Sequence, residues 1–212
     1  MKLDGKYMRL YAVTPARNID TKNLCKQVEM ALKGGITCLQ LREKEADKDK
    51  LLEDALALKK LCHKYKVPLI INDNIDIAIR SGADGVHLGR NDMDIQKARQ
   101  IAGDFLIIGA TVHSTIEARE AINKGADYLG IGAAFPTKTK SDTHMLTMDM
   151  IKDICKAADI PKVLIGGINS ENIRLLKNSK TNGIAVVSAI FSEKNIEDAA
   201  RNLRMISDEL FG

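Results

Sequence analysis

The stretches GGITCLQL at 34–41, GADGVHLG at 82–89 and GADYLGIG at 125–132 decide the fold, and TNGIAVVS at 181–188 is a weaker fourth copy. Each stretch places a turn of small residues directly before a short apolar run. A glycine can end a helix in the left-handed conformation, after which the chain turns straight into a strand. The repeated stretches therefore predict repeated connections from a helix into a strand.

Short aliphatic runs alternate with longer segments of helical periodicity along the whole chain. This alternation is typical of a parallel α/β fold, and eight strands that are each followed by a helix predict a closed TIM (β/α)8 barrel. The expected strands are 10–14, 38–42, 69–73, 85–89, 106–111, 128–132, 163–167 and 184–188. The expected helices are 21–33, 47–65, 75–80, 94–101, 115–123, 148–157, 170–178 and 196–210.

The length of the chain fits this barrel closely. Such barrels typically have about 250 residues and about 200 at the low end, so 212 residues predict one domain spanning 1–212 with short loops. A doubly wound open sheet is the main competitor. Against it, LYAVTPARN stands at 10–18, where a dinucleotide-binding sheet would carry GxGxxG after its first strand.

Composition narrows the class of protein. With 45% hydrophobic and 28% charged residues, the chain has enough apolar side chains for a sizeable core, which excludes disorder. No apolar run approaches the roughly 18 to 20 residues of a membrane-spanning helix. The start MKLDGKYMRLYAVT lacks the apolar segment of a secretory signal, so we expect a cytoplasmic protein. Barrels of this size often form homo-oligomers, and the sequence leaves the oligomeric state open.

The cysteines and the charges exclude further classes. Four scattered cysteines without a CxxC spacing disfavour a disulfide scaffold and a zinc site. The net charge is only +4, the aromatic content is 4% without Trp, and 32 basic residues are interleaved with 28 acidic ones. We therefore expect small-molecule partners and no nucleic acid or membrane.

Polar residues concentrate where the predicted strands end, which is where parallel barrels build active sites. In CLQLREK at 38–44, the two-residue period puts Gln40, Arg42 and Lys44 on one face. Leu39 and Leu41 take the other face, toward the helices. Two cations and an amide at the barrel mouth suit an anionic ligand, although a polar edge strand in solvent would show the same pattern.

Carboxylates follow two neighbouring strands. Asp73 ends the third strand and Asp92 comes three residues after Gly89 in the fourth. Two carboxylates with substrate phosphate oxygens would satisfy Mg²⁺, which usually keeps several waters as well. Taken singly, however, Asp73 could cap the next helix and Asp92 could be a turn or cap residue.

The later strand ends offer groups for phosphate. Thr137, Thr139 and Lys140 follow the sixth strand, Gly166 and Gly167 end the seventh, and Val187 and Ser188 end the eighth. The loops after strands seven and eight are the usual phosphate site of the fold, but a solvated loop and tight turns are the plainer interpretations. His87 and His113 lie near strand ends and are more often structural there, and we expect Cys38 to be core.

Six motifs in order resemble the thiamine-phosphate synthase family. They are QLREK at 40–44, IINDN at 70–74, GADGVHLGRND at 82–92, PTKTK at 136–140, GGI at 166–168 and VVSAI at 186–190, and together they cover essentially the whole chain. The resemblance implies a transferase of thiamine biosynthesis that condenses 4-amino-2-methyl-5-(diphosphooxymethyl)pyrimidine with 4-methyl-5-(2-phosphoethyl)thiazole, or its 2-carboxy form. The products are thiamine phosphate and pyrophosphate.

The resemblance also implies roles for individual residues. Gln40, Leu41, Arg42, Glu43, Lys44, Asn72, Thr111 and Lys140 would hold the pyrimidine diphosphate, with Arg42, Lys44, Lys140 and Thr111 acting in catalysis. One Mg²⁺ per subunit would bind Asp73 and Asp92. The thiazole phosphate would contact Thr137, Lys138, Thr139, Gly167, Val187 and Ser188. This chain departs from the family at GATVH, 109–113, because Thr111 stands where Ser is common; Thr keeps the hydroxyl.

The family mechanism is dissociative and needs no side-chain nucleophile, which agrees with the absence of a persuasive Ser-His or Cys-His pairing. Removing a charge-stabilising donor costs about 2 to 4 kcal/mol in such sites, so Arg42→Ala or Lys140→Ala should lower turnover at least about tenfold. A thiazole tautomerase of the same superfamily, another phosphate-binding isomerase barrel, and a non-catalytic binding barrel are the alternatives. The tautomerase would not need the carboxylates or the cationic clamp, and His113 would be its acid–base residue.

Overall fold

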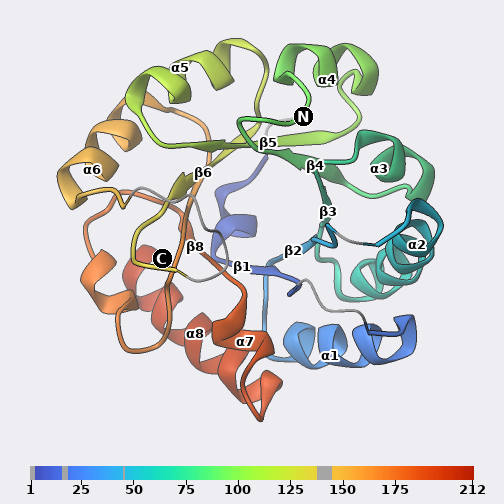
Figure 1. Cartoon of the computed structure of the whole chain (residues 1–212). Helices are drawn as coiled ribbons and strands as arrows, with labels where there is room; N and C mark the ends of the chain where they lie inside the picture. The colour runs from blue at the N-terminus through green and yellow to red at the C-terminus, as the bar shows by residue number, and fades with distance from the viewer. Residues whose placement is uncertain (1–2, 16–18, 45, 138–144) are drawn as a thin grey trace.

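Eight parallel strands close into a barrel in the computed structural model, which describes residues 3–15, 19–44, 46–137 and 145–212. The strands follow chain order, β1-β2-β3-β4-β5-β6-β7-β8, and β8 pairs with β1. Figure 1 shows the barrel along its axis, with the helices arranged outside the strands. The predicted TIM barrel is confirmed. The strands are β1 Leu10–Val13, β2 Cys38–Leu41, β3 Leu69–Asn72, β4 Gly85–Leu88, β5 Ile107–Val112, β6 Tyr128–Gly132, β7 Lys162–Ile165 and β8 Gly183–Val186.

Helices connect the strands, and every α-helix except α7 begins at a polar capping residue. For example, the side chains of Asp47 and Asp94 accept hydrogen bonds from the first turns of α2 and α4, so each helix begins one residue later than expected. The α-helices are α1 Thr21–Lys33, α2 Lys48–Tyr65, α3 Ile75–Ser81, α4 Ile95–Ala102, α5 Thr115–Asn123, α6 Met148–Ala157, α7 Ser188–Phe191 and α8 Ile196–Phe211. In the part of the chain that the structure describes, no helix is long and apolar enough to cross a membrane.

The seventh connection differs from the prediction. A helix was expected over 170–178, but only a 3-10 helix, η2 Ile173–Leu176, forms there. Asn169 and Asn172 bind backbone groups of this loop: Asn169 Oδ1 accepts from the amides of Glu171 and Asn172, and Asn172 Oδ1 accepts from the amide of Asn169. Such local bonds compete with a regular helix. The sequence also gave no sign of η1 Gly5–Met8 or of α7.

The apolar core has two parts, divided by the barrel wall. The larger cluster lies between strands and helices and includes Leu39 and Leu41, both fully buried, as their alternation predicted. The smaller cluster includes Tyr11, Cys38 and Tyr128, whose side chains alternate with the helix-facing ones and therefore fill the barrel interior. Cys38 is thus a core residue, as expected.

A reciprocal pair of hydrogen bonds explains the repeated stretches of the sequence. The side chain of the residue just before each even-numbered strand accepts a hydrogen bond from an amide at the start of the preceding strand, at 2.8–2.9 Å. The donor is the first residue of β1, β3 and β7 and the second residue of β5. The amide of the accepting residue donates back to the carbonyl of the donor residue at 2.7–2.9 Å. The four reciprocal pairs are Thr37 with Leu10, Asp84 with Leu69, Asp127 with Ile108, and Asn182 with Lys162.

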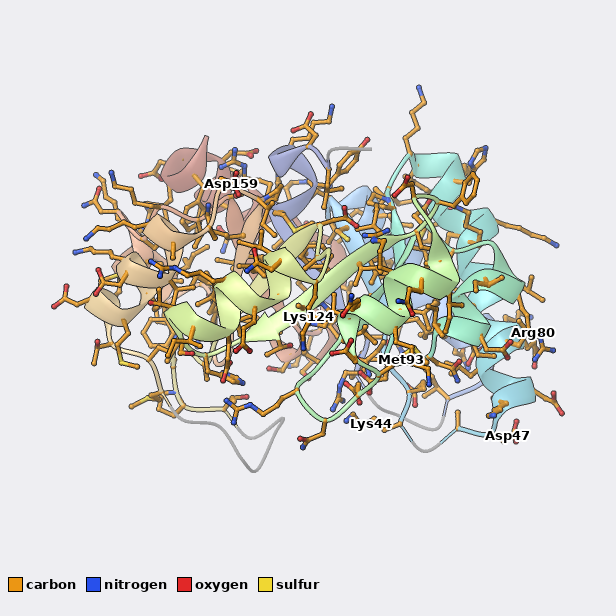
Figure 2. All side chains as sticks on the ribbon, turned by 90° about the horizontal axis from the view of Figure 1, so that it is seen from above. Lys44, Asp47, Arg80, Met93, Lys124 and Asp159 are labelled. Carbon is orange, nitrogen blue, oxygen red and sulfur yellow. The ribbon has the colours of Figure 1, made fainter. Side chains whose placement is uncertain are left out.

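These pairs lie at the amino-terminal ends of the strands, so they leave the opposite end of the barrel for other residues. Figure 2 shows the two ends from the side: Lys44 after β2 and Met93 after β4 lie at one end, and Asp159, which precedes β7, lies at the other. In barrels of this fold the amino-terminal face serves stability and the carboxyl-terminal face carries the active site.

Candidate active site

One pocket opens at the carboxyl ends of the strands and collects polar side chains from around the barrel. It holds about 1020 Å³ of empty space, including the part open to solvent. Its lining includes these predicted site residues: Gln40, Arg42, Asn72, Thr111, Thr137, Gly167, Val187 and Ser188. Residues predicted separately for the pyrimidine diphosphate and for the thiazole phosphate therefore share one pocket. Lys138, Thr139 and Lys140 lie outside the described residues.

The end of β2 supplies the amide and guanidinium side of the pocket. The amide of Arg42 donates to the hydroxyl of Thr14 at 2.8 Å, and the amide of Thr14 donates to the carbonyl of Gln40 at 2.9 Å. Thr14 is fully buried, so these bonds fix the backbone from which Arg42 reaches the pocket. The side chain of Leu41 belongs to the outer core, on the helix side of the strand.

Lys44 and Asp73 meet next to this pocket. Lys44 Nζ lies 3.7 Å from Asp73 Oδ2, and the lysine side chain is half exposed. Asp73 adopts the left-handed conformation, with φ 62°, and its amide donates to the carbonyl of His87 in β4 at 2.8 Å. The cap of α3 is Asn74 rather than Asp73, because the Asn74 side chain accepts from the amide of Ile77. The capping interpretation of Asp73 is therefore wrong.

Asp92 is held in the loop after β4. Its Oδ2 accepts from the amide of Gly89 at 2.7 Å, as a turn residue does, while Asp94 caps α4. Asp73 and Asp92 follow the neighbouring strands β3 and β4. Within the described ranges, no group of three or more His, Cys, Asp or Glu side chains could hold a metal ion. Two hard carboxylates still fit Mg²⁺ if substrate phosphate and water complete its shell.

The opposite wall of the pocket comes from the loops after β6 and β7, which bind each other. The amides of Ala134 and Phe135 donate to the carbonyls of Ile165 and Gly166, both at 3.0 Å. Gly167 has φ 63°, and a Cβ there would lie 2.3 Å from the carbonyl oxygen of Pro136, so only glycine allows this approach. The close contact brings Gly167 and Thr137 to the same pocket.

The floor of the pocket contains a hydrogen-bonded group that the sequence reasoning missed. Tyr11 OH lies 2.8 Å from Tyr128 OH, and His87 Nδ1 lies 2.9 Å from Tyr128 OH. A Cβ on Gly109 would lie 2.1 Å from the Tyr128 ring, so glycine makes room for it. The available signal was the two-residue period of β1 and β6, which points both phenols into the barrel, where a hydroxyl needs a partner.

The other candidate groups have structural partners. His113 Nδ1 lies 2.6 Å from the carbonyl oxygen of Gly132, and its amide donates to Glu117 Oε2 at 2.7 Å. Burial raises the pKa of the Cys38 thiol well above its ordinary value, so this cysteine stays protonated at neutral pH. Cys38 therefore lacks the environment of an activated nucleophile.

Fold and site together define a class: a (β/α)8-barrel enzyme with cationic and hydroxyl groups for anionic ligands at its carboxyl-terminal mouth. The family model described as thiamine monophosphate synthase matches residues 10–190. The chain therefore belongs to the thiamine monophosphate synthase family, and the resemblance carried by its motifs is confirmed.

Individual relatives match this chain over nearly its whole length. The chain is 47% identical to the thiamine-phosphate synthase of Clostridium acetobutylicum, over 91% of this chain and 92% of that protein. It is 43% identical to the thiamine-phosphate synthase of Pyrococcus abyssi, with 97% of each chain covered. The solved thiamine phosphate pyrophosphorylase of Pyrococcus furiosus superposes with a TM-score of 0.89 at 38% identity, covering 98% of this chain and 99% of that one.

Proposed function

We propose that this protein condenses 4-amino-2-methyl-5-(diphosphooxymethyl)pyrimidine with 4-methyl-5-(2-phosphoethyl)thiazole, or its 2-carboxy form, and releases pyrophosphate and thiamine phosphate. The single observation that carries the proposal is the shared pocket, in which Arg42 and Asn72 stand with Thr137, Gly167 and Ser188. A reaction that joins two phosphorylated substrates needs two anion-binding groups around one space. The names of the relatives support the same reaction.

In this proposal the pyrimidine diphosphate lies on the β2 and β5 side. Gln40, Asn72 and Thr111 bind its polar atoms, and Arg42 and Lys44 neutralise the diphosphate, with Leu41 and Glu43 offering backbone groups of the same segment. Lys140 adds a third cation. Charge that develops on a leaving group is stabilised most effectively by donors that are already in place. The hydrogen bond that the Arg42 amide donates to the Thr14 hydroxyl supports such preorganisation.

Asp73 and Asp92 would hold one Mg²⁺ per subunit beside the diphosphate. When bound, the metal would supply positive charge that stabilises the departing pyrophosphate. The ion pair between Lys44 and Asp73 keeps the carboxylate next to a diphosphate-binding cation, so both groups can serve the same ligand.

The thiazole phosphate would bind on the other wall, at Thr137, Gly167, Val187 and Ser188, with Lys138 and Thr139 of the same loop. Positioned there, the thiazole nitrogen faces the pyrimidine carbon that carries the diphosphate. The C–O bond breaks first, pyrophosphate takes the electron pair, and the nitrogen then attacks the resonance-stabilised pyrimidine cation. The chain's contribution is positioning and charge stabilisation, which requires no covalent side-chain intermediate.

The domain organisation, the cellular location and the partners are part of the same proposal. Residues 1–212 would act as one barrel domain in the cytoplasm, with small-molecule substrates and no nucleic-acid partner. The interleaving of 32 basic with 28 acidic residues supports the last point, because a nucleic-acid surface needs a coherent basic patch.

The test is pyrophosphate release by the purified protein, given the pyrimidine diphosphate alone, the thiazole phosphate alone, and both together with Mg²⁺. We expect release only with both substrates, matched by thiamine phosphate and abolished by EDTA. Isomerisation of the thiazole phosphate without pyrophosphate release would replace the proposal with the tautomerase. Binding of both substrates without any product would replace it with a non-catalytic barrel.

A further inference from the structure

A buried threonine joins the ends of β1 and β2 beside the pocket. Thr14 comes directly after β1 and is fully buried. Its hydroxyl accepts a hydrogen bond from the amide of Arg42 at 2.8 Å and donates to the carbonyl oxygen of Arg42 at 3.5 Å. The amide of Thr14 donates to the carbonyl oxygen of Gln40 at 2.9 Å. One side chain therefore contacts both backbone polar groups of Arg42.

The Thr14 hydroxyl takes a place that the backbone fills in a regular strand pair. β1 and β2 pair in parallel, and the last paired residues are Val13 and Gln40. If the parallel ladder continued, the amide of Arg42 would donate to the backbone carbonyl of Thr14. It donates to the hydroxyl instead, so the strand pair ends in a bond that depends on the identity of one side chain.

This bond acts on the residue that carries the guanidinium. Arg42 comes one position after the end of β2 at Leu41, so the ladder by itself leaves its backbone dihedral angles unfixed. With Thr14 bound to its amide and its carbonyl, Arg42 lines the pocket together with Gln40. Ordering this backbone before the ligand arrives removes a cost in conformational entropy from binding.

The effect of Thr14 on a ligand has to be indirect. Thr14 is fully buried and has no surface to offer a ligand, whereas Arg42 lines the pocket. A guanidinium presents a rigid fork of donors, which binds phosphate oxygens well only when the fork is correctly oriented. The orientation of the Arg42 backbone therefore influences how well the pocket binds a diphosphate.

We propose that Thr14 is a positioning residue for the diphosphate ligand, because its hydroxyl holds the Arg42 backbone in the conformation that directs the guanidinium to the pocket. This inference rests on the proposed function, in which one substrate carries a diphosphate and one product is pyrophosphate. Valine has the shape of threonine without the hydroxyl. Thr14→Val would leave the Arg42 amide without its acceptor, and the backbone would turn toward another partner.

Thr37 provides a matched control at the opposite end of the same two strands. Its hydroxyl accepts from the amide of Leu10 at 2.9 Å and lies 3.0 Å from the carbonyl oxygen of Tyr7. Thr37→Val therefore removes a hydroxyl that binds the backbone in a similar way, at the amino-terminal end of the barrel. Thr14→Ser is the conservative variant, because serine keeps the hydroxyl.

The first test measures the binding of inorganic pyrophosphate in the presence of Mg²⁺ by isothermal titration calorimetry. Thr14→Val should raise the Kd about tenfold, as the loss of one well-placed hydrogen bond does. Thr14→Ser and Thr37→Val should both stay within about twofold of the unmodified protein. An unchanged Kd in Thr14→Val would overturn the inference. An equal loss of affinity in both valine variants would overturn it too, because it would reflect a general weakening of the β1–β2 pair.

The second test asks whether Thr14 acts through Arg42. Thr14→Val should lower kcat/KM for the pyrimidine diphosphate about tenfold and leave KM for the thiazole phosphate unchanged. Added to Arg42→Ala, the same substitution should lower kcat/KM by less than about twofold more, because both changes remove one interaction. A further tenfold loss in the double variant would show that Thr14 acts independently of Arg42.

Hydrogen exchange tests the inference without any substitution, in case Thr14→Val does not fold. In the unmodified protein without ligand, the amide of Arg42 should exchange at least about tenfold more slowly than that of the exposed Lys44. Equal exchange rates of the two amides would overturn the inference. Weakened pyrophosphate binding in Thr14→Val alone, in a protein that makes no thiamine phosphate, would support the role of Thr14 and reject the proposed function.

Discussion

Replacing Asp127 with alanine should lower the free energy of unfolding by about 2 to 4 kcal/mol. Its Oδ2 accepts from the amide of Ile108 at 2.8 Å and from Arg99 at 2.5 Å. Ile108 is fully buried, so its amide would lose its partner, at a cost of about 1–3 kcal/mol. The ion pair is about three-quarters buried and adds about 1 kcal/mol at most. The backbone bond from residue 127 to the Ile108 carbonyl is unaffected.

Urea unfolding measures this loss of free energy. In thermal unfolding, the melting temperature of a chain of this length should fall by roughly 6 to 12 °C. Asp127→Asn should cost less than half as much, because an amide oxygen can accept from a strand amide, as Asn182 does for Lys162. Asp153→Ala removes an exposed ion pair with Lys156 and should change stability by less than about 0.5 kcal/mol.

Hydrogen exchange locates the effect. The Ile108 amide should lose more protection than other β5 amides in Asp127→Ala and keep it in Asp127→Asn. Equal destabilisation by alanine and asparagine would show that the charge on Asp127 matters and the strand bond does not, which would refute the reasoning.

Three further predictions concern the pocket and the thiols. Arg42→Ala should lower kcat/KM for the pyrimidine diphosphate at least about tenfold. The exposed Arg80→Ala should not, and equal values for the two variants would remove Arg42 from the clamp. Asp73→Asn and Asp92→Asn should each raise the Mg²⁺ concentration for half-maximal activity about tenfold or more, unlike Asp76→Asn on the surface of α3, and an unchanged metal titration would contradict the assignment. Burial raises the pKa of Cys62 to about 12 and of Cys155 to about 11, so about one Cys155 thiol in 10³ is ionised at pH 8. A thiol reagent should therefore label mainly the half-buried Cys25 in the folded protein, with rates that rise with pH, as mass spectrometry can test; rapid labelling of Cys62 would contradict this.

The order of strands and the inward face of β2 could be predicted because both depend on local periodicity. Leu39 and Leu41 alternate with Gln40, and this alternation alone sets which side chains reach the pocket. The loop after β7 could not be predicted in this way. Its conformation depends on the bonds of the Asn169 and Asn172 side chains, including that from Asn172 to the Gly167 carbonyl at 2.8 Å.

The site also contains both residues that the sequence predicts and contacts that it does not. Gln40, Arg42 and Thr111 follow strands in motifs that can be read directly, and the pocket contains them. Tyr11 and Tyr128 are 117 positions apart, and their contact exists only because the barrel brings β1 and β6 face to face across its interior. The capping interpretation of Asp73 failed for a local reason, since the adjacent Asn74 competes for that position and occupies it.

The four reciprocal pairs divide the barrel into four two-stranded units: β1 with β2, β3 with β4, β5 with β6, and β7 with β8. The four boundaries between these units, such as that between β2 and β3, are the seams of the barrel. A circular permutation therefore has unequal consequences depending on where the chain is opened. An opening between α2 and β3, at Lys66 or Val67, falls on a seam and leaves every pair within a continuous segment. An opening at Gly82, between α3 and β4, puts Asp84 beside a chain end and separates it covalently from the strand it secures. The permissive sites for new termini should thus recur with the period of two strands.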